Sequence, residues 1–153
     1  MTLNVRTFVL LAAAGSLALL GGAFVFQALG YAPCKLCLWQ RWPHAAAIAI
    51  GALILLTGWQ GLAWAGALAA LTTALLGIYH TGIERGLFAG PDTCTSNGVT
   101  GLSPDELMTQ ILNAPLVRCD EVAWSLMGLS MASWNAVLSL VLVALWVAAA
   151  RRA

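Results

Sequence analysis

The stretch WPHAAAIAIGALILLTGWQGLAWAGALAALTTALLGIYHTGI, residues 42–83, runs for 42 residues without an Asp, Glu, Lys or Arg. As one helix it would be about 63 Å long, against a bilayer hydrocarbon core of about 30 Å. We therefore expect it to cross a membrane twice. We place the turn at residues 57–61, where two glycines, Gly58 and Gly61, bracket Trp59 and Gln60.

Two further apolar runs lie outside this pair. The run at residues 7–29 is far longer than the roughly 7–15 residues of a signal-peptide core, so we interpret it as a retained helix. The other run, residues 132–150, stops at Arg151 and Arg152. The sequence predicts an all-α membrane protein with one domain, residues 1–153. We expect a four-transmembrane-helix bundle with helices at about 7–29, 42–57, 62–80 and 132–150, and external cysteine-bearing loops at about 30–41 and 81–131.

The composition excludes whole classes of protein. Hydrophobic residues make up 61% of the chain and charged residues 8%, whereas globular domains average about 45–50% and about 25%. So few charges cannot cover the surface of a water-soluble monomer. The formal net charge of +1 also excludes nucleic-acid binding, which needs a basic face.

The four cysteines suggest an orientation for the bundle. All of them fall on the side opposite the termini, and grouped cysteines in even number fit an oxidising compartment. The Lys and Arg count is nearly balanced, with three on the terminal side and four on the other: Arg6, Arg151 and Arg152 against Lys35, Arg41, Arg85 and Arg118. We give the cysteines more weight, and we expect cytoplasmic termini and external cysteine loops.

Small residues recur every four positions on two of the predicted helices. Such spacing lets helix backbones approach closely inside a membrane. It predicts that two stripes lie at helix interfaces: Ala14, Ala18 and Gly22 on the first helix, and Gly66, Ala70 and Ala74 on the third.

The second external loop is long enough to contain structure of its own. Ser103, Pro104 and Glu106 form a capping box at the start of a helix, and Pro115 ends it. The apolar residues that follow share one face, so we expect a short amphipathic helix on the membrane surface. By contrast, residues 93–98 are small and polar, and we expect Cys94 to be mobile and accessible.

Cys34 and Cys37 form a C-x-x-C pair at the start of the second helix. A helix N-terminus or a nearby cation stabilises a thiolate in such a pair, and Lys35 and Arg41 supply cations. If the segment is helical, Cys37 and Arg41 share one face at a spacing of four, although Pro43 disfavours that geometry.

Three interpretations of the cysteines remain open. A zinc site is disfavoured, because Cys94 and Cys119 do not supply a second close pair; we therefore predict no metal. Two structural disulfides would be possible, and the 94/119 spacing suits a loop-closing bond, but a C-x-x-C constrains little chain. We favour a redox relay in which two cysteine pairs exchange disulfides by thiolate attack. Its electrons need a lipid-soluble acceptor, which indicates a quinone.

The segment Pro33-Cys34-Lys35-Leu36-Cys37-Leu38-Trp39-Gln40-Arg41 resembles the C-x-L-C-x-x-(Q/E)-R signature of the bacterial disulfide bond formation protein B (DsbB) family. The likeness extends over nearly the whole chain. It includes Tyr79-His80-Thr81-Gly82-Ile83-Glu84, Cys119-Asp120-Glu121-Val122-Ala123-Trp124 and Gly128-Leu129-Ser130-Met131-Ala132-Ser133-Trp134-Asn135. A C-x-x-C alone would be a weak signal, but all of these features in order are a strong one.

The resemblance implies a function and a place for each cysteine. A periplasmic DsbA-like thioredoxin-fold oxidase would attack a Cys94–Cys119 disulfide and form a mixed disulfide with Cys94. Cys119 would then attack Cys34 to give a transient Cys34–Cys119 link, leaving Cys37 to donate electrons to quinone. The Cys34–Cys37 disulfide would re-form as quinol leaves.

The resemblance also implies ligand contacts and a location. Arg41 and His80 would contact the quinone, either ubiquinone or menaquinone. Glu84 and Glu121 match family positions, but we expect only solvated loop charges there. The protein would lie in the bacterial inner membrane, with cytoplasmic termini and periplasmic cysteine loops. We also weighed a vitamin K epoxide reductase-like protein, whose cysteine order differs, and a membrane scaffold with structural disulfides.

Overall fold

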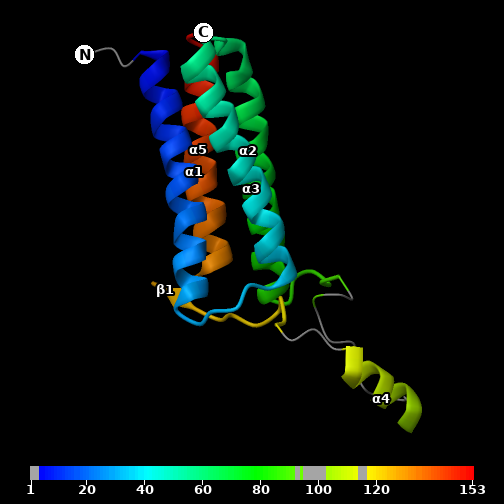
Figure 1. Cartoon of the computed structure of the whole chain (residues 1–153). Coiled ribbons are helices and arrows are strands. Elements are labelled where there is room, and N and C mark those ends of the chain that lie inside the picture. Colours follow the sequence, from blue (N-terminus) through cyan, green and yellow to red (C-terminus); the bar gives the residue numbers. More distant parts are fainter. Residues whose placement is uncertain (1–3, 92–93, 95–102, 114–116) are drawn as a thin grey trace.

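The computed structural model describes residues 4–91, 94, 103–113 and 117–153. Four long helices make up most of this described part: α1 (Val5–Ala28), α2 (Lys35–Thr57), α3 (Ala63–Glu84) and α5 (Met131–Ala150). They lie side by side in one bundle, with the two ends of the chain together at one end of it (Figure 1). The termini therefore share one end of the bundle, as an even number of long helices requires.

Helix α2 begins earlier than the sequence suggested. Cys34 is its N-cap, and the Cys34 Sγ accepts a hydrogen bond from the backbone N–H of Cys37 at 3.2 Å. Our predicted start near residue 42, with a loop at 30–41, is therefore wrong. Lys35 and Arg41 lie in the first turns of α2 although they are charged, and Pro43 lies inside the helix without ending it.

The turn between α2 and α3 lies where we expected it. Gly58 caps α2 in the left-handed conformation, with φ of 76°, which glycine adopts without a steric penalty. The short 3-10 helix η1 (Gln60–Leu62) leads into α3. Helix α3 then continues to Glu84, beyond the predicted end at residue 80, so His80 lies inside the helix.

Three helical segments of the described part are long and apolar enough to cross a membrane: Val5–Ala28, Gln60–Glu84 and Met131–Ala150. Helix α2 is not among them, because its first turns carry the polar residues Lys35, Gln40, Arg41 and His44. The structure is thus mostly helical, with three candidate spans.

Close contact between α3 and α5 rests on small residues. A Cβ on Gly66 would lie 2.5 Å from the Trp146 ring, so only glycine fits there without a shift of its neighbours. Gly66, Ala70 and Ala74 are all buried, as predicted. The stripe predicted on α1 is wrong: Ala14 and Ala18 are exposed, and α1 buries Val9, Ala12 and Ser16 instead. Small residues are common on several faces of α1, so their spacing alone could not select the packed face.

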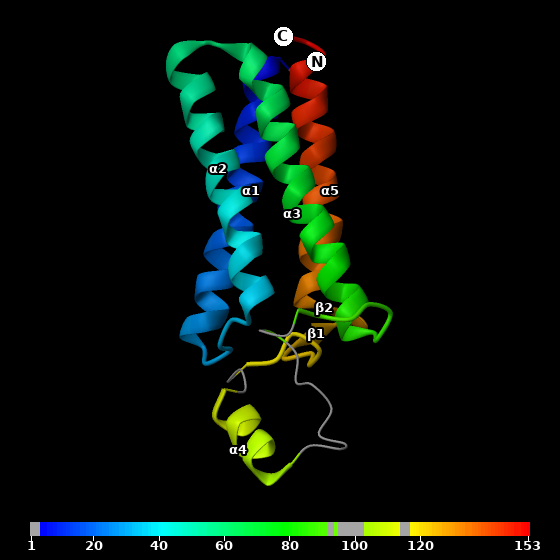
Figure 2. The ribbon, with the colours of Figure 1, turned by 90° about the vertical axis from the view of Figure 1, so that its right-hand side faces the viewer.

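A short helix, α4 (Pro104–Asn113), follows α3. The capping box of α4 forms as predicted: the Ser103 N–H donates to Glu106 Oε2 at 2.9 Å, and the Glu106 N–H donates to Ser103 Oγ at 3.4 Å. Helix α4 lies beyond the end of the bundle (Figure 2). The predicted helix stop at Pro115 lies outside the described residues, as do residues 95–98.

A β-hairpin precedes α5, and an all-α prediction did not include it. Strands β1 (Ser125–Leu126) and β2 (Leu129–Ser130) pair antiparallel, and the turn residues Met127 and Gly128 have φ of 53° and 77°. Two positive φ values are typical of the tight turns that join short antiparallel strands. The Trp134 Nε1–H donates to the Leu126 carbonyl at 3.1 Å and ties the hairpin to α5.

Candidate functional site

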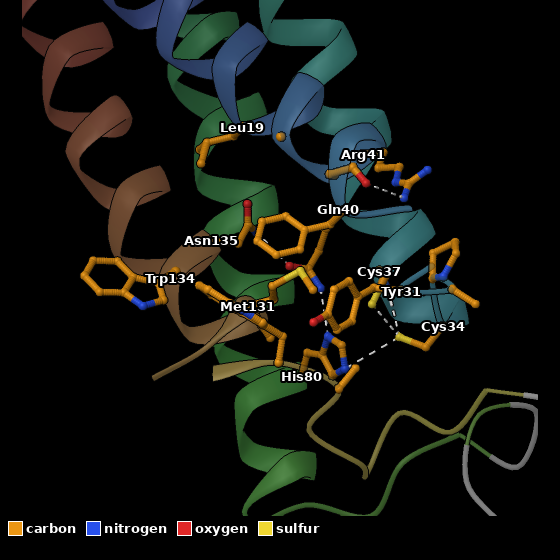
Figure 3. Close-up of a pocket in the computed structure, with 18 of the residues that line it drawn as sticks. Leu19, Tyr31, Cys34, Cys37, Gln40, Arg41, His80, Met131, Trp134 and Asn135 are labelled. Carbon is orange, nitrogen blue, oxygen red and sulfur yellow. Dashed lines mark hydrogen bonds between the residues drawn. The ribbon is translucent and has the colours of Figure 1, made fainter. Parts of the chain in front are cut away.

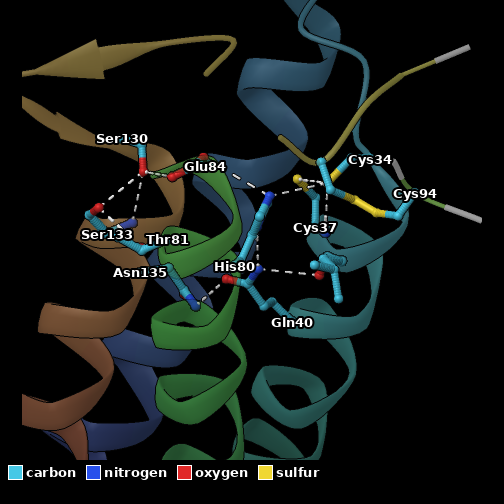
Figure 4. A network of polar contacts seen from close by, with 12 residues as sticks. Cys34, Cys37, Gln40, His80, Thr81, Glu84, Cys94, Ser130, Ser133 and Asn135 are labelled. Atoms are coloured by element: carbon cyan, nitrogen blue, oxygen red, sulfur yellow. Dashed lines mark hydrogen bonds and ion pairs between the residues drawn. A yellow bond between two sulfur atoms is a disulfide. The ribbon is translucent and has the colours of Figure 1, made fainter. Parts of the chain in front are cut away.

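The two cysteine pairs meet at one end of the bundle. Cys94 and Cys119 form a disulfide, whereas Cys34 and Cys37 are free thiols whose Sγ atoms lie 2.7 Å apart. The Cys34 Sγ and both sulfur atoms of the disulfide lie within 4.8 Å of one another. Cys34, the N-cap of α2, thus lies next to both Cys37 and the Cys94–Cys119 disulfide (Figure 4).

Cys94 is not accessible, contrary to our expectation from its polar surroundings. It is fully buried, as is Cys119, and both pack with Cys34, Leu36 and Ile83 in one cluster. The Cys119 N–H also donates to the Cys94 carbonyl at 2.7 Å. A local composition of small polar residues cannot reveal a disulfide that holds one of them against the bundle.

His80 of α3 faces this cluster. Its Nε2 lies 3.6 Å from the Cys34 Sγ and 4.0 Å from Glu84 Oε1. The Glu84 side chain, only 7% exposed, accepts a hydrogen bond from the Ser130 hydroxyl at the start of α5. We had expected a solvated loop charge at Glu84, and this is wrong because α3 extends far enough to place Glu84 one turn beyond His80, inside the bundle. Glu121, in contrast, is exposed.

A buried polar network runs deeper into the bundle from His80. Gln40 contacts His80 Nδ1 at 3.0 Å, and its Oε1 accepts from Asn135 Nδ2 at 2.7 Å. Asn135 Oδ1 lies 2.9 Å from His44 Nε2, which is also 3.2 Å from the Thr73 hydroxyl. Our sequence interpretation gave no role to Gln40, His44, Thr73 or Asn135. Their signal was available, because polar side chains inside apolar helices are rare and usually functional.

Arg41 directly follows Gln40 in α2, and its side chain points toward α1. Its Nη1 donates to Gln27 Oε1 at 2.8 Å and its Nη2 to the Ala23 carbonyl at 3.4 Å, while the guanidinium stacks 4.7 Å from the Phe24 ring centre. Among the described residues, Arg41 Nε has no hydrogen-bond partner. The guanidinium is therefore held by α1, and its Nε–H is left without an acceptor among the described residues.

These side chains line a cavity of about 380 Å³ (Figure 3). Its polar residues include both members of the C-x-x-C pair, Gln40, Arg41 and His80. Much of the remaining wall is apolar or aromatic: Leu19, Phe26, Tyr31, Met131 and Trp134. An apolar cavity with a few convergent polar groups is typical of a binding site for a small organic molecule.

One family of known proteins matches most of the chain. The profile of the family described as "Disulfide bond formation protein DsbB" matches residues 5–149. The chain belongs to the DsbB family. Its members are membrane proteins of disulfide bond formation, which indicates an oxidoreductase activity.

A curated relative of this DsbB-family chain comes from Rickettsia prowazekii (strain Madrid E) and is named "Uncharacterized protein RP370". It is 28% identical over 117 residues, which cover 74% of this chain and 68% of the relative. A search of solved structures gave no significant match.

The thiols of this DsbB-family site differ in their surroundings. The hydrogen bond with Cys37 and burial together raise the pKa of the Cys34 thiol above its usual range. Cys37 lies in the first turn of α2, where the positive end of the helix dipole favours a thiolate. Burial and the contact with Cys37 thus favour the protonated form of Cys34, although the pair lies at a helix N-terminus.

The loop that carries Cys119 is braced by an ion pair. Arg118 donates from Nε and Nη2 to the two carboxylate oxygens of Asp120, at 3.0 Å and 2.5 Å. The hydrogen bonds from Arg118 hold the pKa of Asp120 below its ordinary value. Cys119 lies between the two partners in the sequence, so this pair helps to fix the backbone at the disulfide.

Two groups of side chains in the described part could in principle hold a metal ion. Cys34, Cys37 and His80 offer three ligand atoms within 4.8 Å of one another, one fewer than a closed tetrahedral zinc site uses. The second group, Cys34 with Cys94 and Cys119, has two of its sulfurs joined in a disulfide, which removes their thiolates. Neither group is a complete zinc site in this redox state.

Proposed function

We propose that this chain is a quinone-dependent protein-dithiol oxidoreductase that reoxidises a periplasmic DsbA-type thiol oxidase. The observation that carries the proposal is the position of Cys34, whose sulfur lies against both Cys37 and the Cys94–Cys119 disulfide. Purely structural disulfides give no reason for two pairs to share one buried cluster. Exchange between the pairs requires it, because a thiolate must reach the sulfur that it attacks.

The proposed relay moves one pair of electrons through three disulfides. A thiolate of the partner attacks Cys94, forms a mixed disulfide and releases Cys119 as a thiolate. Cys119 attacks Cys34 of an oxidised Cys34–Cys37 pair, and the electron pair of that bond leaves on Cys37. The partner's second thiolate then displaces Cys94, which closes the Cys94–Cys119 bond again and releases Cys34.

The cavity beside Cys37 fits a quinone. Aromatic and aliphatic side chains would cover a flat ring there, and the buried, unpartnered Nε–H of Arg41 offers a donor near the C-x-x-C pair. A quinone, when bound, supplies the acceptor for two electrons and two protons. As the Cys34–Cys37 disulfide forms, the two sulfurs together would give up two electrons and the proton of Cys34, with the second proton coming from water, while Arg41 favours negative charge near the ring. Ubiquinone and menaquinone both fit this description.

The same proposal gives the topology. Helix α2 is the fourth crossing, since it packs between α1 and α3 and is as long as they are. The termini face the cytoplasm and the cysteine end faces the periplasm of the inner membrane. Cysteines need an oxidising compartment to form disulfides.

Trapping the Cys34–Cys119 link tests the relay. In a Cys37→Ser, Cys94→Ser double variant, we expect Cys34 and Cys119 to join in a disulfide, which mass spectrometry of unreduced peptides detects. A Cys34→Ser, Cys94→Ser variant is the matched control, because Cys37 should not bond to Cys119. Free thiols at both Cys34 and Cys119 under oxidising conditions would contradict the relay.

A further inference from the structure

Two backbone carbonyls determine how the side-chain amides of Gln40 and Asn135 are oriented. The Gln40 amide group has one atom 3.2 Å from the Leu36 carbonyl, and because a carbonyl only accepts, that atom must be Nε2. Gln40 Oε1 then faces Asn135 at 2.7 Å, so the Asn135 atom is Nδ2. The Thr73 carbonyl, 3.4 Å from the same Nδ2, requires the same orientation. The two amides therefore support each other's assignment.

This orientation decides where His80 carries its proton. Gln40 Nε2 has two hydrogens; one serves the Leu36 carbonyl and the other faces His80 Nδ1 at 3.0 Å. An amide nitrogen donates and does not accept, so His80 Nδ1 must accept with its lone pair. In the neutral ring the proton then lies on Nε2, which faces the Cys34 Sγ at 3.6 Å and Glu84 Oε1 at 4.0 Å.

We propose that Gln40 is a positioning residue that keeps the His80 proton on Nε2, so that His80 donates a hydrogen bond to the sulfur of Cys34. The other tautomer would point a lone pair at Cys34 and oppose negative charge there. Gln40 is held from two sides, by α2 through Leu36 and by α5 through Asn135, so it cannot rotate to accommodate that tautomer without losing both bonds. Figure 4 shows the resulting line of contacts from Asn135 through Gln40 and His80 to Cys34.

The His80 Nε2–H stabilises Cys34 in the step in which Cys34 leaves as a thiolate. This part of the inference rests on the proposed relay. When Cys94 displaces Cys34 from the Cys34–Cys119 link, a Cys94–Cys119 bond forms and the Cys34–Cys119 bond breaks. The released electron pair goes to the Cys34 sulfur, with no net oxidation and no further reactant. Cys34 is buried, so the His80 Nε2–H replaces part of the hydration that its negative charge lacks.

Nitrogen NMR of the full chain labelled with ¹⁵N-histidine tests the tautomer directly. The chain has two histidines, and a His44→Gln variant separates their signals. We expect His80 to show the pattern of an Nε2–H imidazole in the unmodified chain. In Gln40→Glu the carboxylate would accept from Nδ1–H, so the His80 pattern should change to that tautomer. Gln60→Glu, the same substitution at the other end of the bundle, should leave it unchanged.

Disulfide exchange inside one chain tests the consequence. A Cys37→Ala chain with one disulfide interconverts between the Cys34–Cys119 and Cys94–Cys119 isomers, and a pH jump followed by acid quenching and mass spectrometry gives the rate. Adding Gln40→Glu should slow release of Cys34 about tenfold, the loss expected for one hydrogen bond to a charged group. Adding Gln60→Glu should not.

Either of two results overturns the inference: an Nδ1–H tautomer at His80 in the unmodified chain, or a changed tautomer in Gln40→Glu with an unchanged exchange rate. The first result needs no variant to fold. Neither measurement uses quinone or a partner protein, so a failure here is distinguishable from a failure of the proposed function.

Discussion

The sulfur of Cys34 lies within 4.8 Å of the sulfur of Cys119, although the two residues are far apart in the sequence. Cys34 reaches this position because it is the N-cap of α2, and Cys119 because its disulfide with Cys94 is buried against the same helix end. The contact links the pair that would meet a partner protein with the pair that borders the cavity.

Replacing Cys37 should stop electron transfer to quinone while sparing the second pair. We expect Cys37→Ser to abolish quinone reduction by a DsbA-like dithiol, because the thiolate beside the cavity is lost. Absorbance of quinone under anaerobic conditions measures this. The Cys94–Cys119 disulfide should still exchange with the partner dithiol in the variant. Undiminished quinone turnover would refute the relay.

Removing the guanidinium of Arg41 should weaken quinone binding. Arg41→Met should raise the KM for quinone about tenfold, as expected for loss of one charged hydrogen-bond donor in an apolar cavity. Arg85→Met, which removes the same charge from an exposed position, is the control. Steady-state kinetics with a soluble quinone analogue measures both. Equal effects of the two substitutions on KM would show that Arg41 does not contribute to the quinone-binding site.

Cys34 should resist alkylation at alkaline pH. Only a thiolate reacts, and the raised pKa of Cys34 keeps it protonated at pH values where an ordinary cysteine, with a pKa of about 8.5, has ionised. Mass spectrometry of the reduced protein across a pH series gives the midpoint. In Cys37→Ala the midpoint should move to lower pH, because the hydrogen bond that is the largest cause of the shift is gone. The same midpoint in both proteins would show that Cys37 does not hold the proton on Cys34.

The contact between Gly66 and Trp146 should limit substitution on α3. Gly66→Ala places a methyl group against the indole ring and should destabilise the bundle by about 1–3 kcal/mol, the usual cost of overpacking. Gly21→Ala, where nothing lies within 4 Å of the new methyl group, should not. Thermal unfolding in detergent compares them, and equal stability of the two variants would be inconsistent with this packing.

Long apolar runs were enough to predict the four helices and the turn near Gly58. They could not locate the start of α2, because a helix can continue beyond the apolar run into a polar segment, and the polar residues there do not show where the helix begins. Its true start depends on the N-cap contact between Cys34 and Cys37, which hydropathy does not encode. The hairpin at Met127 was missed for a related reason, since two-residue strands leave almost no alternating pattern.

The cysteines could be selected from the sequence by their number and grouping, and Arg41 and His80 because they match a family signature. The structure brings Cys34, Cys37, Arg41 and His80 to the cavity, with the Cys94–Cys119 disulfide beside Cys34. The roles of Gln40, Asn135 and Glu84 could not be predicted in this way. Each depends on contacts between helices far apart in the sequence, such as the 2.7 Å contact of Asn135 with Gln40. The spacing of residues in the sequence indicates which of them share a face of one helix, but not which other helix packs against that face.

The most direct measurement of the proposed function is anaerobic turnover of the purified protein with a reduced DsbA-type dithiol and, in turn, ubiquinone and menaquinone. We predict that at least one quinone is reduced, with one quinol formed for each disulfide made in the partner. Oxidation of the partner without quinol formation, or no oxidation with either quinone, would contradict the proposal.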